Sequence, residues 1–217
     1  MFKEQLKTKW YWFARWLCRL FCMLFFRMRS YGRENIPNNG PFLMISNHQS
    51  YLDPILCGCP VKRQLDFLAR ESLFKHWFLS RLISSVCAIP VKLGEADISA
   101  MRKVIDVLKA GRGVCMYPEG TRTTDGRITP LKPGFGLLCR RGKAAVVPVV
   151  IDGAFECWPR HKKLFSPGRI AVCYGKAISA EQATNMGDAK LAQVLTETLR
   201  RMQKTCRIRQ GKKPYDY

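Results

Sequence analysis

Short apolar segments alternate with segments of helical periodicity along most of this chain, and this alternation limits the folds open to it. The apolar segments have the length and composition of buried strands, and they span residues 42–46, 66–69, 87–91, 113–117, 144–151 and 169–174. The helical segments span residues 54–58, 72–85, 96–110, 135–141 and 180–207. Strands that alternate with helices form a sheet covered by helices. We therefore predict a single α/β domain with a mostly parallel or mixed central sheet flanked by helices.

The first thirty residues differ from the rest because they combine aromatic and basic side chains. Their longest uncharged run, residues 20–26, is far shorter than the roughly 20 apolar residues that a membrane-spanning helix needs. No small-residue cleavage site follows, so the segment is not a secretory signal. One interpretation is an amphipathic helix lying in the interface of an anionic bilayer. The other is a helix that packs on the domain with its arginines outward. We favour the interface, with these residues in contact with it: Trp10, Trp12, Arg15, Trp16 and Arg19.

Three regions follow from this division. Residues 1–30 form the amphipathic segment, and residues 31–207 form the α/β domain, which begins at a stretch rich in turn formers, residues 32–41. The basic tail, residues 208–217, has no pattern of core residues, and we predict that it is frayed.

The charge balance indicates an anionic partner. Lys and Arg number 37 and Asp and Glu number 16, which gives a net charge of +21. Nucleic acid, a membrane surface and an anionic substrate all fit this charge. A nucleic-acid platform interleaves aromatic with basic side chains over one face, whereas the aromatic residues here cluster at the N-terminus. We therefore expect an anionic membrane surface as partner and no nucleic acid.

His48 and Asp53 form the first candidate catalytic pair. His48 follows the predicted strand at residues 42–46, and the carboxyl ends of strands are where α/β sheets bind ligands. Neutral imidazole accepts a proton near pH 7, and a carboxylate in reach of the ring fixes its tautomer. Asp53 also reads as the N-cap of a helix that starts at Pro54, or as the partner of Ser50 in a capping box. The two roles of Asp53 are compatible.

The segment at residues 117–122, Tyr-Pro-Glu-Gly-Thr-Arg, is the second candidate site. Gly120 permits a tight turn, and the planar guanidinium of Arg122 suits a phosphate. We expect Glu119, Gly120, Thr121 and Arg122 to form a phosphate site, with Glu119 bracing Arg122 or a substrate hydroxyl. A solvated loop with a surface ion pair is the alternative. Lys132 precedes a Gly-bearing helix start that either cradles an anion or simply begins the helix. No His, Cys or acidic spacing indicates a metal.

These motifs, taken together and in this order, resemble the glycerolipid acyltransferase family, in its bacterial 1-acyl-glycerol-3-phosphate (lysophosphatidate) acyltransferase type. The resemblance covers roughly residues 31–176. His48 and Asp53 match the family's His-x4-Asp box, and residues 118–122 match its Pro-Glu-Gly-Thr-Arg box. Residues 147–149 are similar to a Val-Pro-Val box, and Lys132 with Gly134 matches the Lys-x-Gly before it. One box departs: where many members have apolar-Asp-Arg, this chain ends its strand in Lys92, which carries the charge without the planar fork.

The resemblance implies an activity. His48 would deprotonate the free hydroxyl of a lysophospholipid, most simply 1-acyl-glycerol-3-phosphate, while Asp53 orients the ring. The oxygen would attack the thioester of acyl-CoA or acyl-carrier protein, which is a co-substrate, so no cofactor is expected. Arg122, with Lys92 and Glu119, would hold the phosphate, and backbone N–H groups near Gly120 would stabilise the oxyanion. Another lyso-lipid or glycerol-3-phosphate as acceptor, or a non-catalytic membrane-binding adaptor, are the alternatives. The expected location is the cytoplasmic face of a bacterial cell membrane, as a peripheral or monotopic protein.

Overall fold

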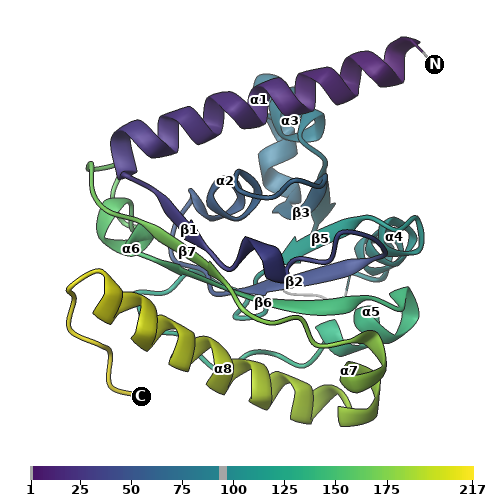
Figure 1. The fold of residues 1–217 in the computed structure, drawn as a ribbon. Coiled ribbons are helices and arrows are strands. Elements are labelled where there is room, and N and C mark those ends of the chain that lie inside the picture. Colours follow the sequence, from purple (N-terminus) through teal and green to yellow (C-terminus); the bar gives the residue numbers. More distant parts are fainter. Residues whose placement is uncertain (1, 93–96) are drawn as a thin grey trace.

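The computed structural model describes residues 2–92 and 97–217, and it contains one seven-stranded sheet between two layers of helices (Figure 1). The strands are β1 (Arg29–Tyr31), β2 (Phe42–Ser46), β3 (Leu65–Arg70), β4 (Ala88–Val91), β5 (Gly113–Met116), β6 (Ala145–Asp152) and β7 (Ala171–Tyr174). Their order in the sheet is β1-β7-β6-β2-β5-β3-β4. Strands β2 to β6 are parallel, β7 is antiparallel to β6, and β1 is parallel to β7. The predicted mixed, mostly parallel sheet is confirmed.

Helices cover both faces of this sheet (Figure 1). They are α1 (Phe2–Phe26), α2 (Asp53–Gly58), α3 (Trp77–Ser85), α4 (Ile98–Lys109), α5 (Phe135–Gly142), α6 (Ala154–Cys157), α7 (Ala180–Met186) and α8 (Asp188–Arg209). Short 3₁₀ turns lie at Arg33–Asn35 and Glu71–Lys75. The helix predicted over residues 96–110 is α4, and Ala96 lies outside the described residues. The long helix predicted over residues 180–207 is divided at Gly187, whose φ is 74°.

The central strands are buried on both faces, which explains their nearly continuous apolar sequence. In β2, Phe42 and Met44 enter a core shared with α1 and α2, while Leu43 and Ile45 enter a second core against α4, α5 and α8. Side chains of a strand alternate between faces, so one run of apolar residues fills both cores. The two cores hold β2 and β5 rigidly, and these strands carry the candidate site.

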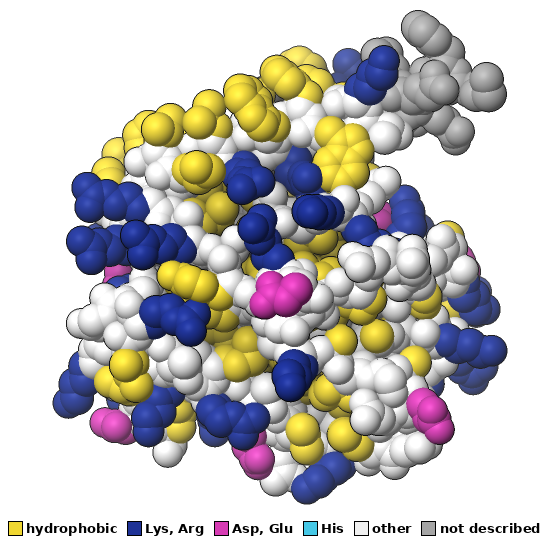
Figure 2. Space-filling view, viewed as in Figure 1, with side chains coloured by type: hydrophobic (Ala, Val, Ile, Leu, Met, Phe, Trp, Pro, Cys, Tyr) yellow, Lys and Arg dark blue, Asp and Glu magenta, His cyan; other side chains and the backbone are white. Residues whose placement is uncertain are grey.

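Helix α1 has one face on the domain and one face outward. Cys22 and Phe26 are fully buried, and the hydroxyl of Tyr11 accepts a hydrogen bond from the backbone N–H of Leu65 at 3.1 Å. Large apolar side chains line the outer face, where Figure 2 shows a hydrophobic row; they are Trp10, Phe13, Trp16, Leu17, Leu20, Met23, Leu24 and Phe25. The inner face therefore packs on the domain, and the exposed apolar outer face leaves the interface interpretation as a prediction. Among the residues described, no helix has the length and apolar content to cross a bilayer.

The predicted interface residues divide between these two faces. Trp10, Trp16 and Arg19 are exposed. Trp12 and Arg15 are half-buried, with the guanidinium of Arg15 stacked 4.0 Å from the centre of the Trp12 ring. The packing interpretation had supposed that the arginines of α1 all point outward. The half-buried Arg15 shows that they do not.

The C-terminal tail, expected to be frayed, instead lies against the domain. The hydroxyl of Tyr217 accepts a hydrogen bond from the backbone N–H of Ile128 at 3.1 Å and donates one to Gln203. Arg207 donates to the backbone carbonyl of Lys213 at 2.7 Å, and its guanidinium stacks on Tyr215. Tyr215 and Tyr217 hold the tail against the domain, which the basic composition of the tail did not indicate.

Candidate active site

The candidate residues gather at the carboxyl ends of β2 and β5. These strands are parallel neighbours, with Ile45 opposite Met116, so the segments that follow them leave the sheet at the same edge. His48 follows β2, and residues 117–122 follow β5. The backbone N–H of Thr123 donates to the carbonyl of His48 at 2.8 Å. That hydrogen bond joins the two motifs directly, although more than seventy residues separate them.

His48 and Asp53 are in contact. Nδ1 of His48 lies 2.6 Å from Oδ2 of Asp53, the Asp53 side chain is fully buried, and the His48 side chain is 22% exposed. A carboxylate is an acceptor, so Nδ1 carries the proton and Nε2 has the lone pair. The ring also stacks on Tyr117, with centroids 4.3 Å apart and an angle of 17° between planes. The imidazole is held in one orientation with one nitrogen ready to accept a proton.

Asp53 is fixed by the loop that carries His48. Besides the ring, its Oδ2 accepts hydrogen bonds from the backbone N–H groups of Gln49 at 2.6 Å and Ser50 at 2.8 Å. Asp53 is the first residue of α2, and the N-cap is Leu52, one residue earlier than predicted. Only half of the predicted capping box is present: the Asp53 carboxylate accepts from the Ser50 N–H, but Ser50 Oγ accepts from the N–H of Leu52 at 3.2 Å in place of that of Asp53. The carboxylate of Asp53 therefore both holds the loop and orients the imidazole.

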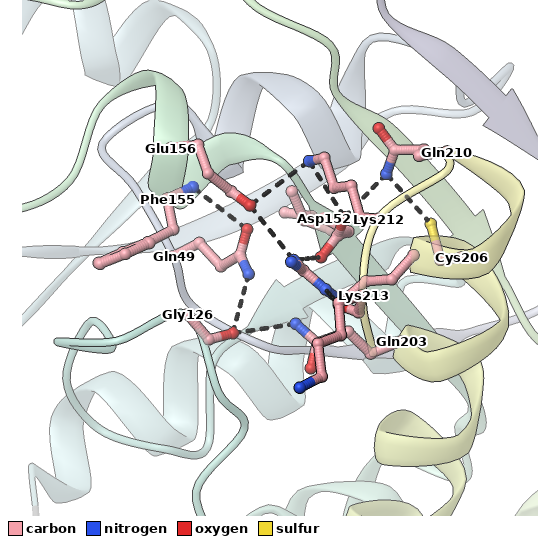
Figure 3. Close-up of polar contacts among 12 residues, drawn as sticks. Gln49, Gly126, Asp152, Phe155, Glu156, Gln203, Cys206, Gln210, Lys212 and Lys213 are labelled. Atoms are coloured by element: carbon pink, nitrogen blue, oxygen red, sulfur yellow. Dashed lines mark hydrogen bonds and ion pairs between the residues drawn. The ribbon is translucent and has the colours of Figure 1, made fainter. Parts of the chain in front are cut away.

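Side chains on both sides of His48 anchor this loop to neighbouring elements. The amide of Asn47 donates to the carbonyl of Ile151 at 2.9 Å and accepts from its N–H at 2.8 Å, which ties the loop to β6. The amide of Gln49 donates to the carbonyl of Gly126 and accepts from Phe155 N–H. Figure 3 shows Gln49 and Gln203 meeting at the Gly126 carbonyl. Buried amides therefore fix the backbone before and after His48.

Glu119 has a different role from the one predicted. Its Oε1 accepts from the backbone N–H of His48 at 2.7 Å, and its Oε2 accepts from the N–H and the hydroxyl of Thr129, both at 2.9 Å. Burial raises the pKa of Glu119, and the hydrogen bonds from Thr129 and His48 oppose that rise. Both oxygens are engaged with the loops, so Glu119 holds His48 in place, and among the described residues it forms no ion pair with Arg122.

Arg122 lies beside the imidazole loop with an unused donor. Its guanidinium carbon is 3.6 Å from the centre of the Tyr51 ring, a cation–π contact that fixes the plane of the fork. Nη1 of Arg122 is buried and has no hydrogen-bond partner among the described residues. A buried donor without a partner is costly, and an anionic ligand would satisfy it.

Lys132 lies against the turn at Gly120. Gly120 has φ of 77°, in the left-handed region, and a Cβ built there would be 3.0 Å from Nζ of Lys132. The N–H of Lys132 donates to the carbonyl of Pro118 at 3.0 Å. The Gly120 N–H donates to the carbonyl of Tyr117, so it is not free for the oxyanion as the resemblance had implied. Two cations, Lys132 and Arg122, thus flank one tight turn.

The remaining predicted residues, Thr121 and Lys92, are less closely associated with the His48 loop. Thr121 is exposed within the turn. Lys92 is exposed at the end of β4, two strands beyond β5 in the sheet, and its backbone N–H donates to Asp97 at 2.9 Å. Adjacent strands are about 4.8 Å apart, so the Lys92 backbone lies roughly 10 Å from β5 along the same edge.

Sequence reasoning missed several residues that contact the site, among them Tyr51, Tyr117, Thr123 and Thr129. Tyr51 and Tyr117 lie inside the two motifs. An aromatic residue in the same motif as the candidate base or the candidate arginine was the sequence signal that could have identified them. Thr129 carries no such signal, since its contact with Glu119 depends on how the loop folds back. Within the described ranges, no group of three or more His, Cys, Asp or Glu side chains is arranged to hold a metal ion.

Comparison with known proteins gives consistent matches. The model of the acyltransferase family matches residues 27–152. A 1-acyl-sn-glycerol-3-phosphate acyltransferase of Bacillus subtilis is 26% identical over 79% of this chain and 84% of that protein. A chloroplastic 1-acyl-sn-glycerol-3-phosphate acyltransferase of Arabidopsis thaliana is 27% identical over 73% of this chain, which spans only 46% of that protein. The crystal structure of the 1-acyl-sn-glycerophosphate acyltransferase PlsC from Thermotoga maritima superposes with a TM-score of 0.81 at 25% identity, covering 92% of this chain and 80% of that one.

Proposed function

The chain belongs to the acyltransferase family, and we propose that it transfers a fatty acyl group to the free hydroxyl of 1-acyl-glycerol-3-phosphate, giving phosphatidate. The acyl donor is acyl-CoA or acyl-carrier protein. One observation carries the proposal: Nδ1 of His48 lies 2.6 Å from Asp53 in a loop hydrogen-bonded to the residue after Arg122. A base and an anion-binding group are thereby fixed close together, as acylation of a phosphorylated alcohol requires.

The chemical step follows from this arrangement. Nε2 of His48 takes the proton of the acceptor hydroxyl as its oxygen attacks the thioester carbonyl carbon. Asp53 stabilises the imidazolium that results. The tetrahedral intermediate then breaks its carbon–sulfur bond, and the departing sulfur takes the proton from His48. The products are the new ester and the free thiol, and His48 is neutral again.

Arg122 is the proposed ligand of the acceptor phosphate. Its unpaired, buried Nη1 supports this role, and stacking on Tyr51 leaves the fork with little freedom to lose on binding. Lys132, beside Gly120, adds a second positive charge, and Lys92 is a more distant contributor. Asp53 and Glu119 act by positioning, since both carboxylates are engaged within the protein. The reaction needs no bound cofactor, because the donor thioester supplies the activated acyl group.

The membrane supplies the acceptor in this proposal. The outer face of α1 presents exposed Phe13, Trp16 and Leu24, as an interfacial helix would. A succession of ring contacts leads from that helix to the site: Phe25 to Phe165 at 5.6 Å, Phe165 to Trp158 at 6.0 Å and Trp158 to Tyr51 at 5.5 Å. We propose that the protein binds peripherally or monotopically to the cytoplasmic face of the cell membrane, with this apolar path beside the lipid.

A panel of acceptors tests the activity. Purified protein in detergent is incubated with labelled acyl-CoA or acyl-carrier protein and with lysophosphatidate, other lysophospholipids or glycerol-3-phosphate in turn. We expect transfer to be fastest to lysophosphatidate. Faster transfer to another acceptor would reassign the substrate. No transfer with either donor would leave a membrane-binding adaptor as the function.

A further inference from the structure

Four arginines from distant parts of the chain surround one cavity at the edge of the sheet. Arg27 and Arg29 come from the end of α1 and the start of β1, Arg169 precedes β7, and Arg209 ends α8. All four are exposed, and with Tyr31 they line a cavity of about 260 Å³. We call this set the arginine cluster. The four arginines are distant in sequence from the turn that carries Arg122, and the proposed reaction does not use them.

The charge of the arginine cluster is not neutralised within the protein. None of the ion pairs between described residues involves any of the four arginines. Asp152 and Arg29 are both in register with Ala171 in the sheet. Asp152 does not neutralise Arg29, because it is buried and forms ion pairs with Arg207 and Lys212. Four guanidinium groups around one cavity repel each other, so an anion that contacts several of them is bound favourably.

The cluster is continuous with the outer apolar face of α1. A neighbouring cavity of about 340 Å³ shares Arg27 and Arg169 with the first and is also lined by Leu24 and Phe25. Leu24 is 68% exposed. Figure 2 shows basic side chains gathered below the C-terminal end of the hydrophobic row of α1. Cationic groups directly beside an exposed apolar surface match the boundary between the headgroups and the acyl chains of a bilayer.

The backbone fixes this junction. Gly168 N–H donates to the carbonyl of Phe25 at 3.2 Å, and Ile170 N–H donates to that of Phe26 at 3.0 Å, so the segment with Arg169 is attached to the helix end. Arg27 has φ of 42°, in the left-handed region that glycine favours at helix ends. The chain therefore presents a guanidinium at a position where glycine would be less strained.

From these observations we infer that the arginine cluster binds the phosphate of an anionic phospholipid headgroup while Leu24 and Phe25 enter the apolar layer beneath it. The inference rests on the membrane location in the proposed function and deepens it. Because β1 and β7 begin at the edge where β6 ends, the cluster lies at the same edge of the sheet as His48. A headgroup held there orients the active site toward the membrane.

Vesicle binding without any substrate tests this inference independently of catalysis. One variant carries R27G, R29Q, R169Q and R209Q, and a matched control carries R102Q, K103Q, K109Q and R141Q, which remove the same charge from α4 and α5. Binding is measured to phosphatidylcholine vesicles with and without a minor fraction of phosphatidylglycerol. We expect the cluster variant to lose at least about tenfold in partition to the anionic vesicles, and the control less than about twofold. Equal losses in the two variants would overturn the inference, because they would indicate non-specific attraction.

Two further measurements complete the test. The single variant R27G relieves the left-handed strain and should fold normally, and we expect it to bind anionic vesicles about fivefold more weakly. Calorimetry with free CoA distinguishes a headgroup from the donor's phosphates: weakened CoA binding with unchanged vesicle binding would assign the cluster to the donor and overturn the inference. Activity in detergent should be unchanged in the cluster variant. A wild-type protein inactive in detergent would count against the proposed function, while the vesicle result would still decide this one.

Discussion

Asp53 has more contacts than a residue that only begins a helix would need. One of its oxygens receives the His48 ring and two backbone N–H groups, so the carboxylate is held by the loop that it orients. The second oxygen is buried without a partner among the described residues. Since Asp53 cannot move without breaking the loop, the imidazole is pre-organised, with Nδ1 as donor and Nε2 left for the proposed role of base.

Replacing His48 with Ala tests the base directly. We expect kcat to fall at least about 10²–10⁴-fold, the usual contribution of a positioned general base, because no other described side chain takes its place beside Asp53. Acyl transfer from labelled acyl-CoA to lysophosphatidate is the measurement. His161→Ala, at an exposed position in a loop, is the control and should keep full activity. Near-normal turnover in the His48 variant would remove His48 from the mechanism.

Arg122→Lys tests the phosphate contact while keeping the charge. Lysine lacks the planar fork and cannot stack on Tyr51 in the same way, so the acceptor KM should rise about tenfold, as when a hydrogen bond to a charged group is lost. The donor KM should change less. Arg127→Lys, an exposed arginine five residues on, serves as control. A larger rise for the donor would mean that Arg122 contacts acyl-CoA instead.

At the scale of elements, sequence patterns located the strands that carry the site but not every short element. The apolar runs of β2, β5 and β6 were recognisable because both faces of these strands are buried. Strand β1 has three residues, Arg29–Tyr31, and no apolar run, and α6 is a single turn, so neither has a period to detect. Contacts such as Glu119 with the His48 N–H were beyond prediction, because they depend on how two distant loops meet.

The turn at Gly120 can be tested against a glycine of the same conformation. Gly120→Ala and Gly111→Ala each place a Cβ at φ near 75°, and each should lose about 1–2 kcal/mol in free energy of unfolding, measured with urea. The Cβ at position 111 meets no atom within 4 Å, whereas the Cβ at position 120 would approach Lys132 Nζ to 3.0 Å. Only Gly120→Ala should therefore raise the acceptor KM. Identical kinetics in the two variants would exclude Lys132 from the phosphate site.

The outer face of α1 can be altered without touching its buried face. Replacing Trp16 and Leu24, which are 57% and 68% exposed, with Ser removes apolar surface from the side proposed to face the membrane. Partition to anionic vesicles, measured by sedimentation, should fall at least about tenfold, since each buried side chain of this size contributes about 1.5–3 kcal/mol. Ile98→Ser with Met186→Ser, on α4 and α7 across the sheet, is the control. Unchanged sedimentation of the α1 variant, with an intact fold by circular dichroism, would show that α1 serves packing alone.

At the scale of the whole molecule, the C-terminal tail is connected to the candidate site, while α1 and α8 both end beside β1. Helix α1 ends beside β1, and α8 ends beside the same strand, where the guanidinium of Arg209 lies 4.4 Å from the centre of the Tyr31 ring. The tail then returns along α8 to Gln203. Gln203 and Gln49 donate to the same carbonyl, that of Gly126 (Figure 3). Because Tyr217 donates to Gln203, Tyr217 is connected through these contacts to the residue after His48.

This connection predicts an effect of the tail on catalysis. Tyr217→Phe removes one hydroxyl and leaves the Gln203 oxygen and the Ile128 N–H without their partner, which costs about 1 kcal/mol in stability. Gln203 then holds the Gly126 carbonyl less firmly, and Gln49 and His48 gain freedom. We expect kcat to fall on the order of 2–10-fold, with both KM values nearly unchanged, because alignment is lost and not binding. Tyr31→Phe, which removes a hydroxyl from β1, is the control. A loss of stability with unchanged kcat would mean that the tail supports the fold but does not position the base.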